Sequence, residues 1–426
     1  MQNIWRPVLL MVLLFLSFNC SAQLIIDADI RPRFEYRHGF GNLFPDDADP
    51  GAFIEQRTRL NINYTIDNLK LGISVQDVSV WGDTPQIART DDNNSFSLFQ
   101  AWINYEFDSH WSTKLGRQVL SYDDQRILGG LDWAQQGRSH DAALIRFKND
   151  RFKADIGFAF NQESVQSEGN GFFIQSAFSY KTMQFAHFHK DWKSLGASLL
   201  LLNTGFQRTK IENNESVEDG VSYIQTFGTF INQSIKNGAL RSSFYYQFGE
   251  STGEMDISAY QFLLELDYKP NKTLFGLGAE FLSGTDQNGE TMNKSFTPLY
   301  GTNHKFNGYM DYFYVGNHAN NIGLNDLYAK VIFTTGKRSD LLIKSHYFLS
   351  NAELNNNADS YLGTEIDLVY TLKPAKNVVL NVGYSHMFAS ESMSLIKNGR
   401  PYDNTNNWAW VRLMFRPTLL KTNPSN

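Results

Sequence analysis

Hydrophobic and charged residues alternate strictly along the segment 26–37. Successive side chains of a β-strand point to opposite faces, so this segment would have one apolar face and one ionised face. The apolar positions are Ile26, Ala28, Ile30, Pro32, Phe34 and Tyr36, and the charged positions are Asp27, Asp29, Arg31, Arg33, Glu35 and Arg37. The alternation recurs along the chain, with no helices to cover a soluble sheet. It therefore favours a membrane β-barrel, with lipid outside and water inside, over a soluble all-β protein.

Segments of about ten residues, the length that a tilted strand needs to cross a bilayer, follow one another along the chain. The pattern predicts an all-β fold, a transmembrane antiparallel β-barrel of about 18 strands. The predicted strands are 24–37, 53–66, 69–81, 95–107, 111–119, 139–147, 151–160, 180–190, 194–206, 221–232, 238–248, 257–269, 273–283, 326–335, 340–350, 360–372, 378–388 and 406–416.

The connections between these strands alternate in length. The short ones are 67–68, 108–110, 148–150, 191–193, 233–237, 270–272, 336–339 and 373–377, and the long ones are 38–52, 82–94, 120–138, 161–179, 207–220, 249–256, 284–325, 351–359 and 389–405. Phe172 to Ser179 also looks like a strand, but counting it would place later short turns on the wrong side. With an even strand number, all short turns face the periplasm and all long loops face outward.

The composition agrees with a barrel. Aromatic residues make up 14% of the 426 residues, which suits aromatic belts at the membrane interfaces. The mean hydropathy of −0.37 excludes a helical membrane protein, but it fits a wall in which half the strand residues are polar. The formal net charge of −6 gives no reason to expect nucleic acid as a partner.

The first 22 residues have the features of a signal peptide. Arg6 is the positive region, and the apolar run 8–18 is too short to span a bilayer. We expect cleavage after Ala22, which leaves residues 23–426 as a single transmembrane barrel domain. Cleavage there removes Cys20, the one cysteine of the chain, which suits an oxidising compartment. Lipoprotein processing at Cys20 is the alternative.

Arginines are concentrated in the first third of the sequence. Guanidinium groups stay ionised and bind carboxylates in a bidentate way, so a row of them in the lumen would favour anionic solutes. The alternative is that they pair with acidic residues such as Asp27, Asp29, Glu35 and Glu55 and brace the wall. The predicted pore-lining, anion-binding residues are Arg31, Arg33, Arg57, Arg59, Arg117, Arg126 and Arg138, supported by Glu55, Asp141 and Trp133.

Two long loops have unusual composition. The loop 120–138 contains Trp133 and two adjacent glycines, and either it folds inward to narrow the pore or it packs on the rim. The loop 284–325 contains FTPLYGTNHKFNGYMDYF, which is dense in aromatic and amide side chains. Such side chains suit sugar stacking, and they equally suit a compact cap.

The sequence offers little support for an enzyme. His187 and His189 share one face of a predicted strand, but no third metal ligand follows by spacing. No HExxH, GxSxG or Walker pattern occurs in the sequence. We therefore expect no catalytic residue, no metal and no cofactor.

The sequence resembles the alginate export family of outer-membrane barrels. The resemblance rests on the segments RPRFEYR, EQRTRLN, GRQVLSYDDQRILGGLDWAQQGRSHDAALIRF and PLYGTNHKFNGYMDYF. It implies a monomeric 18-stranded barrel with a positively lined conduit that passes an anionic polysaccharide outward. The matching residues would be Arg57, Arg59, Arg117, Arg126 and Arg138, with Asp141 beside them. In this chain, acidic residues stand among the arginines of the expected lumen face.

We therefore expect a channel in the outer membrane of a Gram-negative bacterium. Its expected cargo is a polar, anionic solute such as an acidic oligo- or polysaccharide. The alternatives are an uptake porin for small carboxylates or sugars, a surface-binding barrel with a plugged lumen, and an outer-membrane enzyme. The expected partners are outer-membrane lipid and the barrel-assembly machinery.

Overall fold

The computed structural model describes residues 22–87, 95–173, 178–319 and 321–423. The expected signal peptide, with Arg6 and Cys20, lies outside these residues except for its last residue, Ala22.

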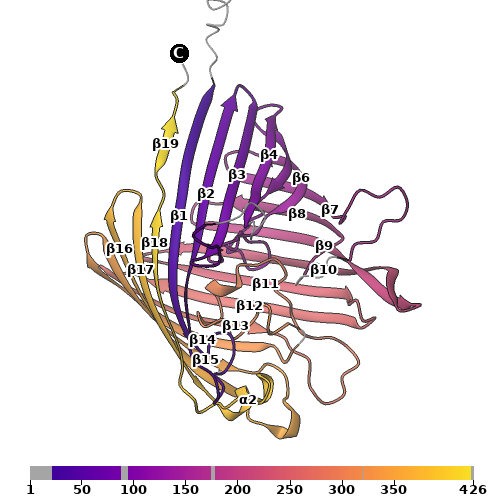
Figure 1. The fold of residues 1–426 in the computed structure, drawn as a ribbon, viewed down its shortest axis with the longest axis vertical. Helices are drawn as coiled ribbons and strands as arrows, with labels where there is room; N and C mark the ends of the chain where they lie inside the picture. Colours follow the sequence, from indigo (N-terminus) through magenta and orange to yellow (C-terminus); the bar gives the residue numbers. More distant parts are fainter. Residues whose placement is uncertain (1–21, 88–94, 174–177, 320, 424–426) are drawn as a thin grey trace, which may run out of the picture.

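The strands form one closed antiparallel barrel (Figure 1). β1 (Gln23–His38) pairs on one side with β2 (Gly51–Ile66), and on the other with β18 (Asn406–Phe415) and β19 (Thr418–Lys421). β18 and β19 follow one another along β1 and together make one interrupted strand, so the wall has the predicted eighteen. The other strands are β3 (Leu69–Val80), β4 (Phe96–Glu106), β5 (Trp111–Gln118), β6 (His140–Lys148), β7 (Phe152–Phe160), β8 (Thr182–Asp191), β9 (Leu195–Glu212), β10 (Glu215–Ile235), β11 (Gly238–Glu250), β12 (Asp256–Tyr268), β13 (Thr273–Leu282), β14 (Leu324–Gly336), β15 (Ser339–Leu349), β16 (Tyr361–Ala375) and β17 (Val378–Ala389).

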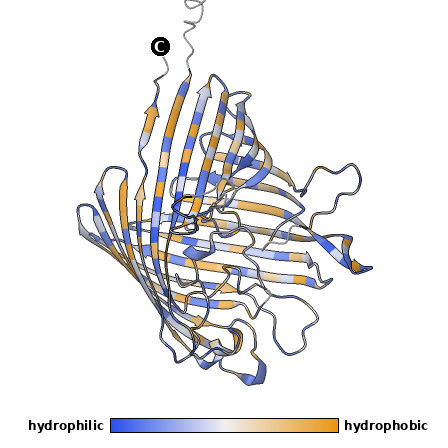
Figure 2. Ribbon diagram, in the orientation of Figure 1, coloured by the Kyte–Doolittle hydropathy of each residue, from blue (hydrophilic) through white to orange (hydrophobic). Residues whose placement is uncertain are grey.

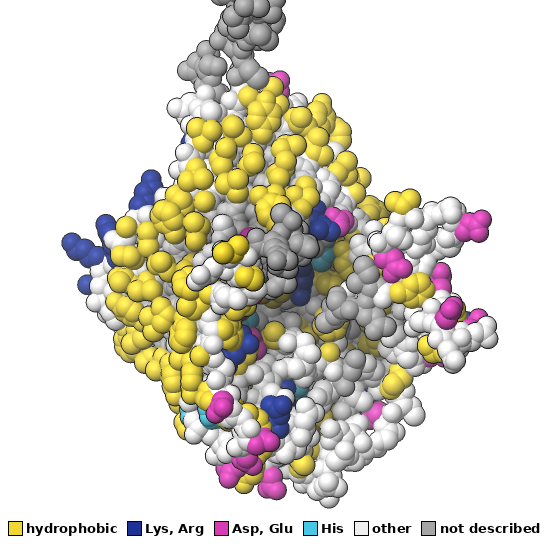
Figure 3. All heavy atoms as spheres, viewed as in Figure 1, with side chains coloured by type: hydrophobic (Ala, Val, Ile, Leu, Met, Phe, Trp, Pro, Cys, Tyr) yellow, Lys and Arg dark blue, Asp and Glu magenta, His cyan; other side chains and the backbone are white. Residues whose placement is uncertain are grey.

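The barrel is apolar outside and polar inside. In β1, Ile30 and Phe34 are exposed, whereas Arg31, Arg33 and Glu35 between and beyond them are buried. Hydropathy alternates in the same way along the other strands (Figure 2). Hydrophobic side chains cover the outer wall over β1 to β3 and β16 to β18, and charged side chains gather in the central hollow and on the loops and turns (Figure 3). The predicted alternation of the two faces is therefore confirmed.

The connections alternate in length as predicted, with one exception. Residues 207–220 were predicted to be a loop, but β9 and β10 continue through most of this segment and turn at Asn213 and Asn214. The side chains there are largely polar on both faces of the hairpin. The apolar alternation therefore ends before the ladder of backbone hydrogen bonds does.

Helices are minor elements. The described helical segments are the α-helix α2 (Glu391–Ile396) and the 3₁₀ turns η1 (Asn303–Lys305) and η2 (Asn355–Asn357). The Ser390 hydroxyl accepts from the Met393 amide at the start of α2. None of the helices in the described part of the chain is long and apolar enough to cross a membrane.

A cluster of buried apolar residues lies inside the barrel, where two long loops fold inward. Ile127 and Leu128 of the loop 119–139 are buried with Phe296, Leu299 and other residues of the loop 283–323. A backbone bridge joins Leu128 to Tyr300, which fixes the two loops to each other. The prediction for 120–138 left inward folding and rim packing open, and the structure has the loop inside.

Candidate functional site: the lumen and its inward-folded loops

Four of the predicted arginines lie together on the inner face of β1 and β2. The strand register places Arg31 opposite Arg57 and Asp29 opposite Arg59. Arg31 and Arg57 have no exposed surface, and Arg33 is 3% exposed. Strict alternation in two paired strands is sufficient to bring these side chains into one cluster.

Acidic residues neutralise part of this cluster. Arg57 Nη2 lies 2.5 Å from Asp29 Oδ2, and Arg33 lies 2.7 Å from Glu35 and 3.1 Å from Glu55. These pairs are the contacts that the bracing alternative describes, and the arginines that make them lie on the inner face of the wall.

The remaining donors of the cluster hold the loop 119–139. Arg31 donates to the carbonyls of Asp132 (2.5 Å) and Ala134 (2.9 Å). Its Nε donates to Gln135 Oε1 at 2.9 Å, and Arg33 donates to the Trp133 carbonyl at 2.9 Å. A guanidinium has five N–H donors in a fixed plane, so one buried arginine can satisfy several carbonyls of a folded-in loop.

Trp133 is the central side chain of this loop. Its ring stacks on the buried His304 at a centroid distance of 4.1 Å, which ties it to the loop 283–323. The guanidinium groups of Arg33 and Arg412 lie 4.3 Å and 4.8 Å from the ring centroid. Trp133 therefore joins both inner loops to the arginines of the wall.

Arg126 and Arg138 fix the loops from the other side. Arg126 is 1% exposed, and its Nε lies 2.8 Å from Glu280 Oε1 on β13. Its Nη2 donates to Asn307 Oδ1 at 2.8 Å, and Arg138 donates to the Gly301 carbonyl at 3.0 Å. These two predicted residues lie inside the barrel, where they connect the loops to each other and to the wall.

Arg117 is placed differently from the prediction. It pairs with Asp141 across β5 and β6, with 2.6 Å between Nη2 and Oδ2, and both side chains are about half exposed. Arg117 follows Leu115 by two residues, and Leu115 is an exposed residue of the outer face. Arg117 and Asp141 therefore lie on the outward face, apart from the lumen arginines.

Among the charged groups of the loops, Asp124 and Lys397 have pKa values that are shifted towards neutral pH. Loss of water around Asp124 raises the pKa of its carboxyl to about 6, against the opposing effect of Lys305. Burial lowers the pKa of the Lys397 ammonium to about 7, and this ammonium donates to the Tyr312 carbonyl. Both groups thus titrate close to neutral pH.

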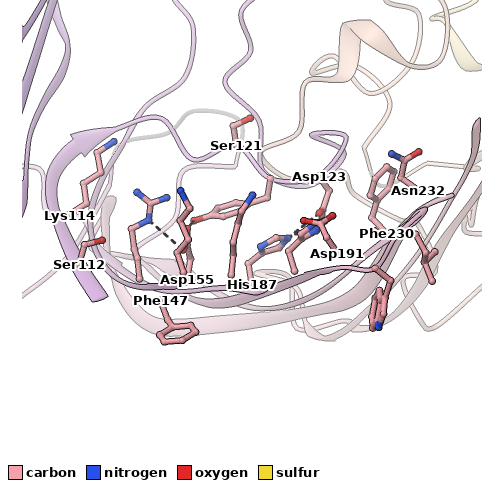
Figure 4. A pocket seen from close by; sticks show the side chains of 18 of the residues that line it. Ser112, Lys114, Ser121, Asp123, Phe147, Asp155, His187, Asp191, Phe230 and Asn232 are labelled. Carbon is pink, nitrogen blue, oxygen red and sulfur yellow. Dashed lines mark hydrogen bonds and ion pairs between the residues drawn. The ribbon is translucent and has the colours of Figure 1, made fainter. Parts of the chain in front are cut away.

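A chamber of about 880 Å³ lies between the loop 119–139 and the wall from β3 to β10 (Figure 4). Ser121 and Asp123 approach from the loop, Lys114, Asp155 and His187 line the wall, and Phe147 points away from the chamber. A second cavity of about 520 Å³ continues along β11 to β15 and shares Asp123, Phe230 and Asn232 with the first.

The chamber lies at the end of the barrel where the short turns join the strands. Of the described residues that line it, six are basic and four are acidic. The basic residues are Lys70, Lys114, Arg146, Lys148, Lys153 and Lys193, and the acidic residues are Glu106, Asp123, Asp155 and Asp191. A concave surface with an excess of one charge concentrates solutes of the opposite charge.

The lysines of this chamber are not among the site residues that the sequence analysis predicted. Lys114 lies in the predicted strand 111–119, two residues after Ser112, so both side chains point to the same face. Trp111 and Leu115, which are exposed on the outside, point to the other face. The alternation could therefore have identified it as an inward residue. The arginine-rich motifs attracted attention to Arg117 instead.

The two histidines of β8 have acidic partners. His187 lies 3.1 Å from Asp123 of the inner loop, and His189 lies 3.0 Å from Asp191. The first contact joins the loop to the wall. In the described ranges, no group of three or more His, Cys, Asp or Glu side chains could hold a metal ion.

Comparison with known proteins identifies the relatives of this fold. A family model described as alginate export matches residues 22–398. Curated proteins gave no match. Among solved structures, Pseudomonas aeruginosa OpdQ is similar with a TM-score of 0.57 and 13% identity, over 93% of this chain and 98% of that chain. Acinetobacter baumannii OccAB4 has a TM-score of 0.62 and 13% identity over the same shares. At such identities the likeness concerns the fold.

Proposed function

The chain belongs to the alginate export family, and from this membership and the geometry of the lumen we propose that it passes polar, anionic solutes such as acidic oligo- or polysaccharides. It is an outer-membrane β-barrel channel of porin type in a Gram-negative envelope, with the fold and family of a transport protein. We further propose that it works as a monomer and is inserted by the barrel-assembly machinery.

The observation that carries the proposed cargo is the basic chamber at the short-turn end, which faces the periplasm in outer-membrane barrels. Its cations lie along a wall that a solute must pass, and a low-dielectric pore strengthens their attraction for an anion. The arginine cluster adds to this positive field, because among the described residues its cations outnumber the carboxylates that pair with them or lie beside them. The cations are Arg31, Arg33, Arg37, Arg57, Arg59, Arg412 and Arg416, and the carboxylates are Asp29, Glu35, Glu55 and Asp132.

In this proposal the predicted arginines act in two ways. Arg31, Arg33, Arg57 and Arg59 give the inner wall its positive potential, and with Arg126 and Arg138 they fix the loops that narrow the lumen. Glu55 and Trp133 support them through the contacts described above. Arg117 and Asp141 take no part, because they lie on the outward face.

The test is the reversal potential of the purified mature protein in a planar bilayer under a KCl gradient. We expect a preference for chloride over potassium that falls when Lys114 and Lys153 are both replaced by Met. A preference for potassium would overturn the proposal. The absence of steady conductance would instead favour a surface-binding barrel with a plugged lumen.

An uptake porin for small carboxylates or sugars has the same geometry, because a passive pore has no built-in direction. The two candidates differ in the size of the solute. Vesicle-swelling rates with gluconate and with trigalacturonate would separate them, since a conduit for oligosaccharides admits both solutes and a porin for small solutes admits gluconate alone.

A further inference from the structure

We propose that Trp102 and Lys114 form a binding subsite for a carboxylated sugar on the wall of the basic chamber. This inference rests on the proposed function and names a place and a ligand chemistry for it. Both side chains line the chamber of about 880 Å³, on the neighbouring strands β4 and β5.

The absence of a side chain at Gly72 creates the room that the indole of Trp102 occupies. The register places Gly72 of β3 and Gly116 of β5 directly on either side of Trp102. A Cβ atom on Gly72 would lie 2.3 Å from Cζ2 of the indole, so a side chain there would displace the ring. The indole thus lies against the backbone of β3 as an aromatic platform on the chamber wall.

Lys114 places a positive charge at this platform. Its Nζ lies 4.0 Å from the centroid of the Trp102 ring. Within the described part of the chain Lys114 has no ion pair, whereas Lys70 lies 2.5 Å from Glu106 and Arg146 lies 3.4 Å from Asp155. A cation–π contact positions an ammonium without pairing it with a carboxylate, so Lys114 is left open to the carboxylate of a ligand.

Polar side chains on the neighbouring strands β4, β5 and β6 lie near Trp102. Asn104 is the register partner of Lys114, and Ser112 is the register partner of Arg146. All four line the chamber, and Figure 4 shows Ser112 and Lys114 side by side at one end of it. The Arg146 side chain is 42% exposed, which leaves part of its guanidinium open to a second anion contact.

This set of groups matches the chemistry of a uronic acid residue. The apolar face of a pyranose ring covers an indole, while its carboxylate binds ammonium and guanidinium groups and its hydroxyls bind amide and hydroxyl side chains. The flexible stem of Lys114 lets the ammonium follow the carboxylate to the edge of the ring. A neutral sugar lacks the charged contact, and a simple carboxylate lacks the stacking contact.

The experiment measures blockade of the channel current by trigalacturonate, with maltotriose as the neutral probe of equal length. We expect trigalacturonate to block the wild-type channel at a concentration about tenfold lower than maltotriose. Lys114→Met should raise the half-blocking concentration of trigalacturonate about tenfold, whereas Lys114→Arg should restore most of the block. Lys153→Met removes the same charge from the same chamber, away from the platform, and should raise the value by about twofold at most, the part due to the charge of the chamber as a whole.

Gly72→Val separates stacking from charge, because it displaces the indole and removes no charged group from the chamber. It should weaken the block by trigalacturonate and leave the reversal potential in KCl unchanged. It also tests the proposal if Lys114→Met fails to insert as a folded barrel.

Equal effects of Lys114→Met and Lys153→Met, or equal block by trigalacturonate and maltotriose, would overturn the subsite. Either result with a chloride-selective wild-type channel leaves the proposed anion channel standing. A potassium-selective wild-type channel would instead remove the proposed function.

Discussion

At the scale of single residues, Arg31 shows how a fully buried cation is accommodated inside the barrel. Burying a charge is costly unless hydrogen bonds replace its water. Arg31 is completely buried, and its charge is met by a row of backbone carbonyls and a glutamine side chain. A lysine has no planar set of donors that could reach these acceptors together. Arg31 therefore holds the loop 119–139 through hydrogen bonds and is also part of the positively charged wall.

Replacing Arg31 by Met should release this loop. The substitution leaves the carbonyls of Asp132 and Ala134 without the Arg31 donor. It should destabilise the inward conformation of the loop by on the order of 3 kcal/mol. We expect a higher single-channel conductance and more frequent current fluctuations, measured in planar bilayers.

Arg117→Met is the matched control for this prediction. It breaks an exposed pair on the outward face, which contributes about 0–1 kcal/mol, and should leave conductance unchanged. If Arg31→Met conducts as the wild type does, the loop is held by its other contacts alone.

These residues also mark what the sequence could predict. Alternation placed Arg31, Arg33, Arg57 and Arg59 on the inner face, because a strand permits only two directions for a side chain. Their partners were not predictable, because backbone carbonyls of a distant loop leave no signal in residue types. Arg117 was misplaced because its motif was given more weight than its parity with Leu115.

At the scale of elements, the two inner loops and β13 form one interlocked unit. Arg126 of the loop 119–139 and Glu280 of β13 are both buried, and Asn307 of the loop 283–323 bonds to each of them. Loops with so many buried polar groups need partners for all of them. Buried charged and amide groups thus fix the unit inside the barrel.

The Arg126–Glu280 pair should show strong energetic coupling. Removing one partner leaves a buried charge uncompensated, at a cost of about 3–5 kcal/mol, whereas removing both is much milder. We expect faster chymotrypsin cleavage within residues 119–139 for Arg126→Met and for Glu280→Gln, and partial recovery in the double variant. Additive effects in the double variant would show that the two side chains act independently.

The ends of the strands were predictable only where the alternation of apolar and polar residues ends at the same place as the backbone pairing. Turns such as 67–68 separate two apolar alternations and were placed correctly. The hairpin of β9 and β10 continues through Gln207 and Arg208, where both faces meet water. The backbones of β9 and β10 stay hydrogen-bonded there, but apolar and polar residues no longer alternate. The sequence therefore predicted a loop.

At the scale of the whole molecule, the barrel separates two solvents with one wall. Leu199 and Leu201 of β9 are exposed outward at 43% and 45%, while Leu200 and Leu202 between and beyond them are buried inside. Closure of β1 against β18 and β19 leaves no free strand edge along this wall. The chain can therefore keep large apolar side chains exposed, because lipid covers them.

The length of β9 predicts where that lipid ends. At about 3.3 Å per residue and a tilt near 45°, Leu201 lies roughly 14 Å above the start of the strand, and Ile211 lies roughly 37 Å above it. The apolar band of an outer-membrane barrel is about 25 Å tall, so Leu201 falls near its centre and Ile211 falls beyond it. Ile211 is nevertheless the more exposed of the two, at 71%.

Arginine should therefore be much more costly at Leu201 than at Ile211. Leu201→Arg puts a charge in hydrocarbon and should lower the free energy of unfolding by about 2–4 kcal/mol, whereas Ile211→Arg should change it by about 0–1 kcal/mol. Urea titration of the protein in lipid vesicles measures both values. Equal losses would mean that the upper hairpin also lies in lipid, whereas equal neutrality would mean that the outward face of β9 meets water along its whole length.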